Sequence, residues 1–186
     1  AYEEMYLSLV RLSQDNTVEA FLHSFRALEA LVVTWIQTHY PEIIQHPTGQ
    51  GFIKLRKTET CQAFNQDHRI IALFQGRNTN QAPRAEIDLH NYARQTILTI
   101  ADPAFAESLD LAPLWGRAKD LRNQLSHQIV GISPLEMFHA WGVTNQNQWE
   151  KRMLTCLNLL SGQRFASLQQ PSLFASLHYR IKQTLD

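Results

Sequence analysis

The sequence is short of the residues that mark several protein classes. It has 2 cysteines, 7 glycines and 7 prolines among 186 residues, and only 18% of its residues are charged. This is too little glycine and proline for a loop-rich scaffold, and 44% hydrophobic residues are too many for a disordered chain. The composition therefore predicts one compact domain with a sizeable core.

The chain also lacks net charge. Its 17 lysines and arginines balance 17 aspartates and glutamates, and the sequence pI is about 7.3. Domains that hold nucleic acid by bulk electrostatics are usually strongly basic. A polyanionic partner would therefore have to be bound locally, by a few convergent cations.

Long apolar runs are absent. The longest, Ala27–Ile36, is interrupted by Glu29 and Thr34 and is far shorter than the roughly 20 residues that span a bilayer. The first residues do not have the basic and apolar pattern of a secretory signal, nor do they include a start methionine. We therefore expect a cytoplasmic protein without a membrane partner, and residues 1–186 as a single helical domain excised from a longer chain.

The two cysteines, Cys61 and Cys156, have neither a CxxC spacing nor a histidine cluster beside them. Free cysteines are commonly buried as small core residues. No set of Asp, Glu, His and Cys has the spacing of metal ligands. We predict two core thiols, no metal site and no cofactor.

Apolar residues recur every three or four positions along most of the chain, which is typical of amphipathic helices. The pattern predicts helices over residues 3–12, 18–40, 61–74, 85–100, 105–127, 149–160 and 173–185. Breaks fall at 47–51, 76–83 and 161–171, and no alternating strand pattern appears. The polar segment 76–83 is the best candidate for a mobile loop. The fold class is therefore all-α, a bundle of about six to eight helices.

One helical segment combines groups that suit phosphate chemistry. Arg122, Asn123 and His127 lie within six residues. Arginine can bind a phosphate with two parallel hydrogen bonds, and histidine can transfer a proton near neutral pH. Asparagine can orient either group by hydrogen bonding. Lys119, Asn123 and His127 share one helix face, whereas Arg122 lies about 140° round the axis from His127. The arginine and histidine heads therefore converge only if the arginine wraps back or the helix loosens. On spacing alone, a solvated helix with a histidine near its C-terminal dipole is the better explanation.

The run from Arg122 to His127, R-N-Q-L-S-H, resembles the R-N-x-x-x-H form of the motif of the HEPN superfamily, whose members are small helical bundles. The resemblance implies a HEPN-like fold and a metal-independent endoribonuclease that cuts single-stranded RNA at a composite homodimer site. The RNA 2′-hydroxyl would attack the adjacent phosphate and leave a 2′,3′-cyclic phosphate. His127 would assist proton transfer, Arg122 would stabilise the charge on phosphorus, and Asn123 would position these groups.

Four further residues are candidates to support such a site. Lys119 and Arg117 would add affinity for phosphate beside the motif. HEPN domains often bring a polar residue of the first long helix close to the motif, so the resemblance points to Glu29 or Arg26 as a partner that orients Arg122. All four residues also fit solvated helix positions, with Arg26 and Glu29 as a local i, i+3 pair.

Two features help to choose among branches of the superfamily. Toxins of toxin–antitoxin pairs often extend the motif to a tyrosine, and Ile129 stands at that place. The site in the C-terminal half and the helices after it resemble the effector domain of CRISPR-associated ancillary ribonucleases, in which a CARF domain senses cyclic oligoadenylate. We expect such an antiviral effector, with its sensing domain outside this chain. A HEPN toxin and a non-catalytic helical dimerisation or binding module are the alternatives.

Overall fold

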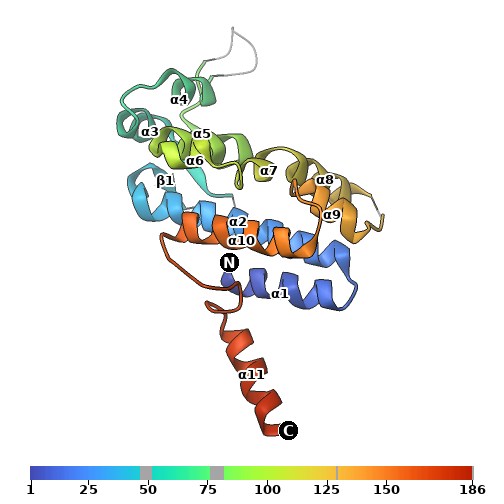
Figure 1. The fold of residues 1–186 in the computed structure, drawn as a ribbon. Helices are drawn as coiled ribbons and strands as arrows, with labels where there is room; N and C mark the ends of the chain where they lie inside the picture. The colour runs from blue at the N-terminus through green and yellow to red at the C-terminus, as the bar shows by residue number, and fades with distance from the viewer. Residues whose placement is uncertain (47–51, 76–81, 129, 186) are drawn as a thin grey trace. The chain divides into compact units, whose positions relative to one another are not determined.

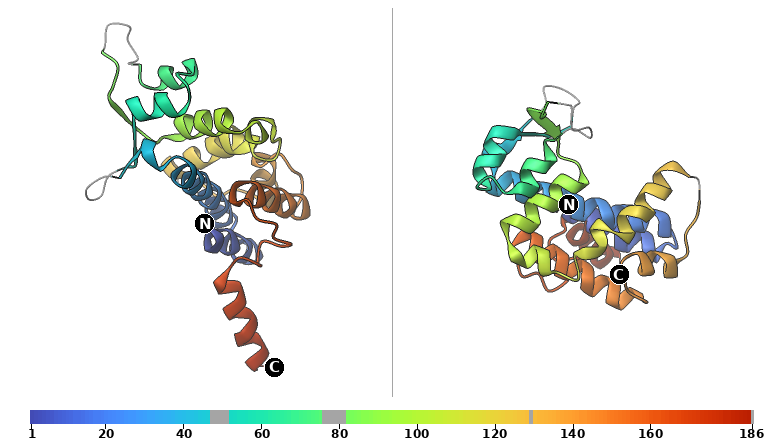
Figure 2. Two further views of the ribbon diagram at one scale, coloured as in Figure 1. Left: turned by 90° about the vertical axis from the view of Figure 1, so that its left-hand side faces the viewer. Right: turned by 90° about the horizontal axis from the view of Figure 1, so that it is seen from above.

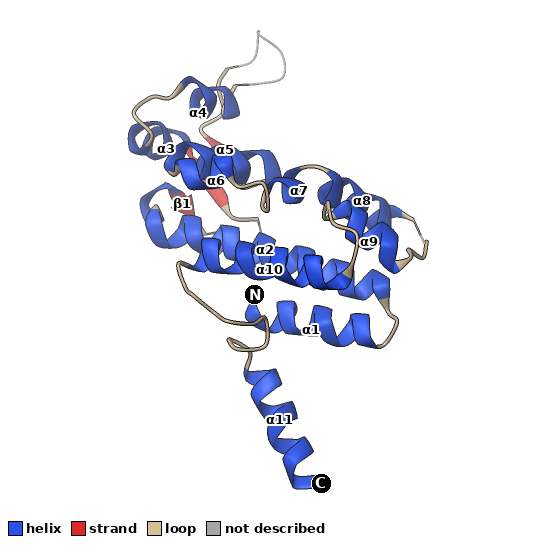
Figure 3. Ribbon diagram, in the orientation of Figure 1, coloured by secondary structure: helices blue, strands red, loops and turns tan. Residues whose placement is uncertain are grey.

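Helices make up most of the chain. The computed structural model describes residues 1–46, 52–75, 82–128 and 130–185. Within these ranges it contains eleven α-helices, one short 3-10 helix and a small three-stranded sheet (Figures 1 and 3). The prediction of a mainly helical chain is confirmed. None of the described helices has the length and apolar character needed to cross a membrane.

The chain divides into two compact units. The first consists of Ala1–Leu31 and Leu109–Asp186, and the second of Val32–Ser108. Helix α2 (Thr17–His39) contributes residues to both. The motif residues and all the residues expected to support them belong to the first unit.

The described residues of the first unit form helices and loops around an aromatic core. Besides α1 (Tyr2–Ser13) and the start of α2, the unit holds five helices: α7 (Ala112–Trp115), α8 (Arg117–His127), α9 (Pro134–Ala140), α10 (Gln146–Ser161) and α11 (Leu173–Leu185). The fully buried Trp141 ring lies 6.0 Å from Phe21 and 6.2 Å from Phe25 between ring centroids. These three rings join the end of α9 to the face of α2.

The second unit contains the sheet. Its elements after α2 are the 3-10 helix Pro41–Ile43, β1 (Ile44–Gln45), β2 (Lys54–Arg56), α3 (Lys57–Ala63), α4 (His68–Leu73), β3 (Glu86–Asp88), α5 (Asn91–Ala101) and α6 (Pro103–Glu107). The strands pair antiparallel in the order β1-β2-β3, with Ile44 opposite Leu55 and Leu55 opposite Ile87. All three side chains are buried, so one row across the sheet faces the core. Strands of two or three residues are too short to show alternation, which is why the sequence pattern missed them.

The structure has more and shorter helices than the six to eight predicted. The predicted helix over 61–74 is two helices, α3 and α4, because Asn65 and Gln66 between them adopt positive φ. The predicted helix over 105–127 is three helices, with Pro113 at the start of α7 and Gly116 immediately before α8. Local backbone geometry therefore ends helices at places where the regular spacing of apolar residues continues.

One helix was not predicted at all. Ser133 and Glu136 form a capping box at the start of α9, and Pro134 occupies its first turn. The predicted break at 47–51 lies outside the described residues. So do Ile129 and most of the predicted mobile loop 76–83, including Arg77.

Both cysteines are free and buried, as predicted. Burial, with a smaller contribution from the negative charge of Asp110, raises the pKa of the Cys156 thiol to about 12. Burial also raises the pKa of Cys61. Neither thiol is therefore in the ionised form that reacts near neutral pH.

Helix α11 is attached to α1 at its N-terminal end (Figure 2). The Glu3 carboxylate accepts hydrogen bonds from the Ser172 hydroxyl at 2.7 Å and from the backbone N–H groups of Leu173 and Phe174 at 2.8 and 3.2 Å. Partial burial acts to raise the pKa of Glu3, but these hydrogen bonds outweigh it and leave that pKa below its ordinary value. Glu3 thus caps a helix whose first residue is 170 positions away.

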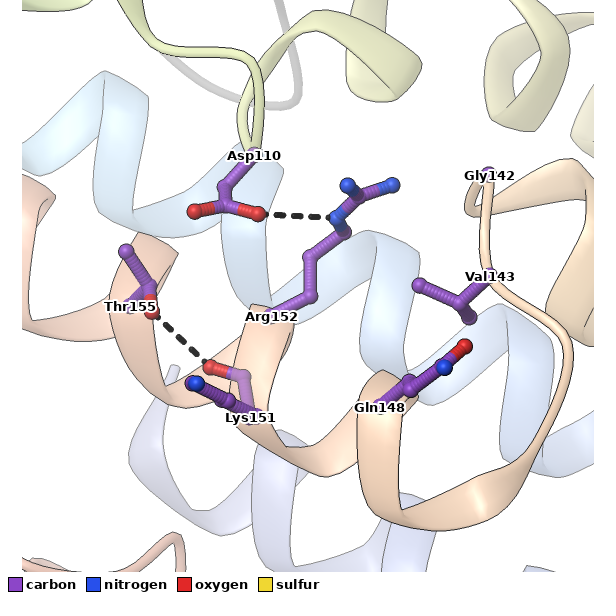
Figure 4. A pocket seen from close by; sticks show the side chains of 7 residues that line it. All are labelled: Asp110, Gly142, Val143, Gln148, Lys151, Arg152 and Thr155. Atoms are coloured by element: carbon purple, nitrogen blue, oxygen red, sulfur yellow. Dashed lines mark hydrogen bonds and ion pairs between the residues drawn. The ribbon is translucent and has the colours of Figure 1, made fainter.

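A polar clamp ties α10 to two other segments of the first unit. Arg152 Nε donates to Asp110 Oδ1 at 3.0 Å (Figure 4), and Arg152 Nη1 donates to the Trp141 carbonyl oxygen. Gly142 follows with φ +69°, and a Cβ built there would lie 2.7 Å from Arg152 Nη1. Glycine therefore suits the backbone conformation at this position, and a larger residue would also have to displace the end of the Arg152 side chain.

Replacing Gly142 by alanine should lower the free energy of unfolding more than the same change at Gly162. Both glycines have positive φ, but a Cβ at position 162 would meet no heavy atom within 4 Å. We expect Gly162→Ala to cost about 1 kcal/mol from backbone strain alone, and Gly142→Ala about 3 kcal/mol because Arg152 must also move. Urea unfolding followed by circular dichroism measures both changes. Equal losses of unfolding free energy would show that the contact with Arg152 contributes nothing at position 142.

Candidate functional site

The motif helix α8 is regular from Arg117 to its last residue, His127, and Gln128 after it is extended. The predicted face of Lys119, Asn123 and His127 is therefore present, since these positions are one turn apart along an unbroken helix. Asn123 and His127 are exposed. Within the described part of the chain neither side chain has a hydrogen-bond partner, so both polar groups are available to a ligand.

Arg122 points the other way, towards α2. Its Nη2 lies 3.5 Å from Glu29 Oε1, and the carbon at the centre of its guanidinium group lies 5.2 Å from the centroid of the Phe25 ring. The Arg122 and Glu29 side chains are 33% and 21% exposed. An ion pair and a cation–π contact that are this far removed from water hold the arginine against α2.

Arg122 therefore does not converge on His127 within one chain. The two side chains could meet only if the helix ended before His127 or if the Arg122 side chain turned back towards it. The helix continues to His127, and the Arg122 side chain contacts Glu29 instead. In the described residues no contact joins the two side chains. Arg122 still has N–H groups beyond the one that faces Glu29, and Arg122 Nε is buried without a partner in this part of the structure.

The candidate supporting residues have different surroundings. Glu29 contacts Arg122, as the resemblance implied for either Glu29 or Arg26. Arg26 is exposed and makes no ion pair with any described residue. Lys119, whose side chain is 37% exposed, lies on the Asn123 face with Nζ 3.8 Å from Asp120 Oδ1. Of the two polar candidates on α2, only Glu29 reaches the motif.

Arg117 lies on another face of α8, at an open pocket of about 390 Å³ between α8 and α9. The residues that line the pocket are Arg117, Asp120, Leu121, Gln124, Glu136, His139 and Ala140. Asp120 and Glu136 place two carboxyl groups beside the arginine, which weakens its attraction for a phosphate. Asp120 also lies 3.8 Å from Lys119 Nζ, so its carboxyl group offsets part of the positive charge of both residues.

Two features of the first unit were missed by the sequence analysis. Phe25 lies one turn before Glu29 on α2, so the spacing alone already places both residues on the face that meets Arg122. The Asp110–Arg152 pair lines a pocket of about 410 Å³ with Lys151 and Thr155 at its edge (Figure 4). Because the two partners are 42 residues apart, no local pattern signals this pair.

The described residues contain no group of three or more His, Cys, Asp or Glu side chains that could hold a metal ion. Comparison of the chain with protein-family models, with curated proteins and with solved structures finds no match. The interpretation of the site therefore depends on its own residues and their geometry.

The contact between Arg122 and Glu29 should appear as a coupling free energy in a double-mutant cycle of Glu29→Gln and Arg122→Gln. We expect about 1 kcal/mol, because the pair is mostly removed from solvent. Urea unfolding of the four proteins measures it.

The matched control is the pair Lys119 and Asp120, whose aspartate is 74% exposed. Its coupling should be close to zero, as is usual for solvated pairs. Equal coupling in the two cycles would show that Arg122 is not held by Glu29.

Proposed function

We propose that this chain is a metal-independent endoribonuclease domain that cuts single-stranded RNA at a composite site formed by two copies. The observation that carries the proposal is that the motif residues of α8 have different surroundings. Arg122 is oriented by Glu29 and Phe25, while Asn123 and His127 are exposed on a neighbouring face of the same helix. A half-buried carboxylate that orients an arginine beside exposed acid–base groups suits phosphoryl transfer.

A second copy completes the site. One chain presents Asn123 and His127 outwards, and its Arg122 lies about 140° away round the helix. Two copies whose α8 helices meet would place two arginines and two histidines in one cleft, where the arginine of one copy and the histidine of the other could act on the same phosphate. This also fits the zero net charge, because the site needs only a few convergent cations.

The reaction is a transesterification. A neutral His127 accepts the proton of the RNA 2′-hydroxyl as the 2′-oxygen attacks phosphorus, and the bond to the 5′-oxygen breaks. The leaving oxygen takes a proton from the other copy's His127 in its protonated form, which yields a 2′,3′-cyclic phosphate and a 5′-hydroxyl. Arg122 stabilises the extra negative charge on phosphorus, Asn123 positions the phosphate, and Lys119 binds a neighbouring one.

The biological setting that we propose is antiviral defence, with this domain as a HEPN effector of a CRISPR-associated ribonuclease. The support is the motif itself and the helices α9, α10 and α11 that follow it. Ile129 in place of the toxin tyrosine disfavours the toxin branch. Control by cyclic oligoadenylate would then come from a domain outside this chain.

A non-catalytic helical module is the second candidate, because one observation favours it. Arg122 already has two structural contacts inside a single chain, so holding α8 against α2 is a sufficient role for the motif. In that case the exposed His127 would contribute nothing to chemistry. Activity measurements on matched variants separate the two candidates.

Purified protein should cut single-stranded RNA in the presence of EDTA, and either Arg122→Ala or His127→Ala should lower the rate at least about 100-fold. The matched controls are Arg164→Ala and His68→Ala, both at exposed positions outside the motif helix, which should cut at the normal rate. Gel analysis of end-labelled RNA gives the rate and identifies the cyclic phosphate.

Mixing the Arg122→Ala and His127→Ala chains tests the composite site directly. A mixed dimer would hold one arginine and one histidine in the shared cleft, so part of the activity should return. No cleavage by the unaltered protein, or normal rates in both motif variants, would favour the non-catalytic module. Cleavage that requires added divalent metal would show that the mechanism is wrong.

A further inference from the structure

The open pocket between α8 and α9 borders the helix face that carries Asn123 and His127. Gln124, which lines the pocket, is three residues before His127 on the same regular helix, about 60° from it round the axis. Side chains at this spacing have Cβ atoms about 5–6 Å apart. A nucleotide whose phosphate is held at His127 could therefore place its base in the pocket. The pocket volume of about 390 Å³ lies in the range of small-ligand sites, roughly 300–1,000 Å³.

The charges that line this pocket do not suit a second phosphate. Asp120 and Glu136 contribute two carboxyl groups against one arginine, Arg117. Glu136 accepts hydrogen bonds from the backbone N–H and the hydroxyl of Ser133, and these bonds hold its pKa below the ordinary value, so it is ionised near neutral pH. A phosphate would therefore meet more negative than positive charge. The pocket is better suited to a neutral group that donates hydrogen bonds.

Two polar side chains of α8 are available to such a group. The Asp120 side chain is 74% exposed, and its contact with Lys119 Nζ, at 3.8 Å, is made through Oδ1. Gln124 is exposed, and its side-chain amide has no hydrogen-bond partner in the described part of the chain. Because Asp120 and Gln124 are four residues apart on the helix, their side chains are neighbours. A carboxylate that accepts hydrogen bonds thus lies beside an amide that can donate one.

Guanine matches this pair of groups better than the other three RNA bases. Its Watson–Crick edge carries two adjacent donors, the ring N–H and the amino group, beside a carbonyl acceptor. Adenine and cytosine have a ring acceptor next to the amino group, and uracil has one donor between two acceptors. Single-stranded RNA is commonly recognised at this edge while the base stacks on an aromatic ring. Asp120 would accept both guanine donors, Gln124 would donate to the carbonyl oxygen, and His139 supplies a ring at the pocket for stacking.

We propose that the pocket between α8 and α9 binds a guanine base of the RNA, with Asp120 and Gln124 as the residues that select it. The inference rests on the proposed function, because it places the phosphate beside this base at His127. Neither Asp120 nor Gln124 takes part in the transesterification. Base binding can be measured in a chain that does not cut RNA, so the two proposals can fail separately.

Cleavage by the unaltered chain separates the pocket from the proposed function. If both proposals hold, cuts in an RNA of mixed sequence fall beside guanines. Cuts without any base preference would overturn the pocket and leave the nuclease, whereas a guanine preference in binding without any cleavage would keep the pocket and overturn the nuclease.

Fluorescence anisotropy with the full chain carrying His127→Ala measures the base preference without cutting. The probes are short labelled oligouridines with one central G, A, C or U. The G probe should bind at least about fivefold more tightly than the other three, which is the low end of the discrimination that a bidentate base contact gives. Equal affinities for the four probes, or no binding of any probe, overturn the proposal.

Two further variants with matched controls locate the preference. Added to the same chain, Asp120→Asn or Gln124→Ala should lower the affinity for the G probe to that for the uridine probe, with the helical circular dichroism unchanged. Asp15→Asn and Gln163→Ala are the same changes at exposed positions outside α8 and α9, and they should keep the preference. A preference that survives both pocket variants, or that is lost equally in the controls, overturns the assignment of guanine to this pocket.

Discussion

The motif helix α8 buries a single residue, Ala118, so apolar packing contributes little to holding it in place. Arg122 joins it to α2, because its guanidinium group lies 3.5 Å from the Glu29 carboxylate and 5.2 Å from the centroid of the Phe25 ring. Because the arginine anchors the inner side of the helix, Asn123 and His127 must point outwards. Helical spacing relates the direction of the other motif side chains to that of Arg122.

The same contact limits how the motif can act. An arginine that faces α2 and a histidine that faces solvent cannot act on one phosphate from within a single chain. The geometry is instead suited to two chains that each contribute part of a site. In the proposed composite site Glu29 would have a positioning role, because it contacts Arg122, the cation that would meet the phosphate.

The regular spacing of apolar residues was the most reliable guide to the helices. Helix α2 is uninterrupted and was predicted to within a residue at each end, because its apolar spacing continues over 23 residues. The divided helices were harder, since Pro113 and Gly116 interrupt an apolar pattern that continues past them. The start of α9 had a readable signal in Ser133 and Glu136, whereas strands of two or three residues have none.

The candidate site was predictable where it is local. Helical spacing alone indicated the shared face of Asn123 and His127 and the different direction of Arg122. The choice between Glu29 and Arg26 was not local, because Glu29 lies 93 residues from Arg122 in the chain. The contact between Asp110 and Arg152 is likewise a product of tertiary packing, which single-sequence patterns do not encode.

The capping of α11 by Glu3 has a consequence for how the protein is made. Synthesis proceeds from the N-terminus, so the carboxylate that caps α11 is in place long before the helix emerges from the ribosome. A short isolated helix is marginal in water, and a cap that is already present favours its first turn. Helix α11 would therefore form against α1, which is synthesised earlier, and loss of Glu3 would be felt 170 residues further along the chain.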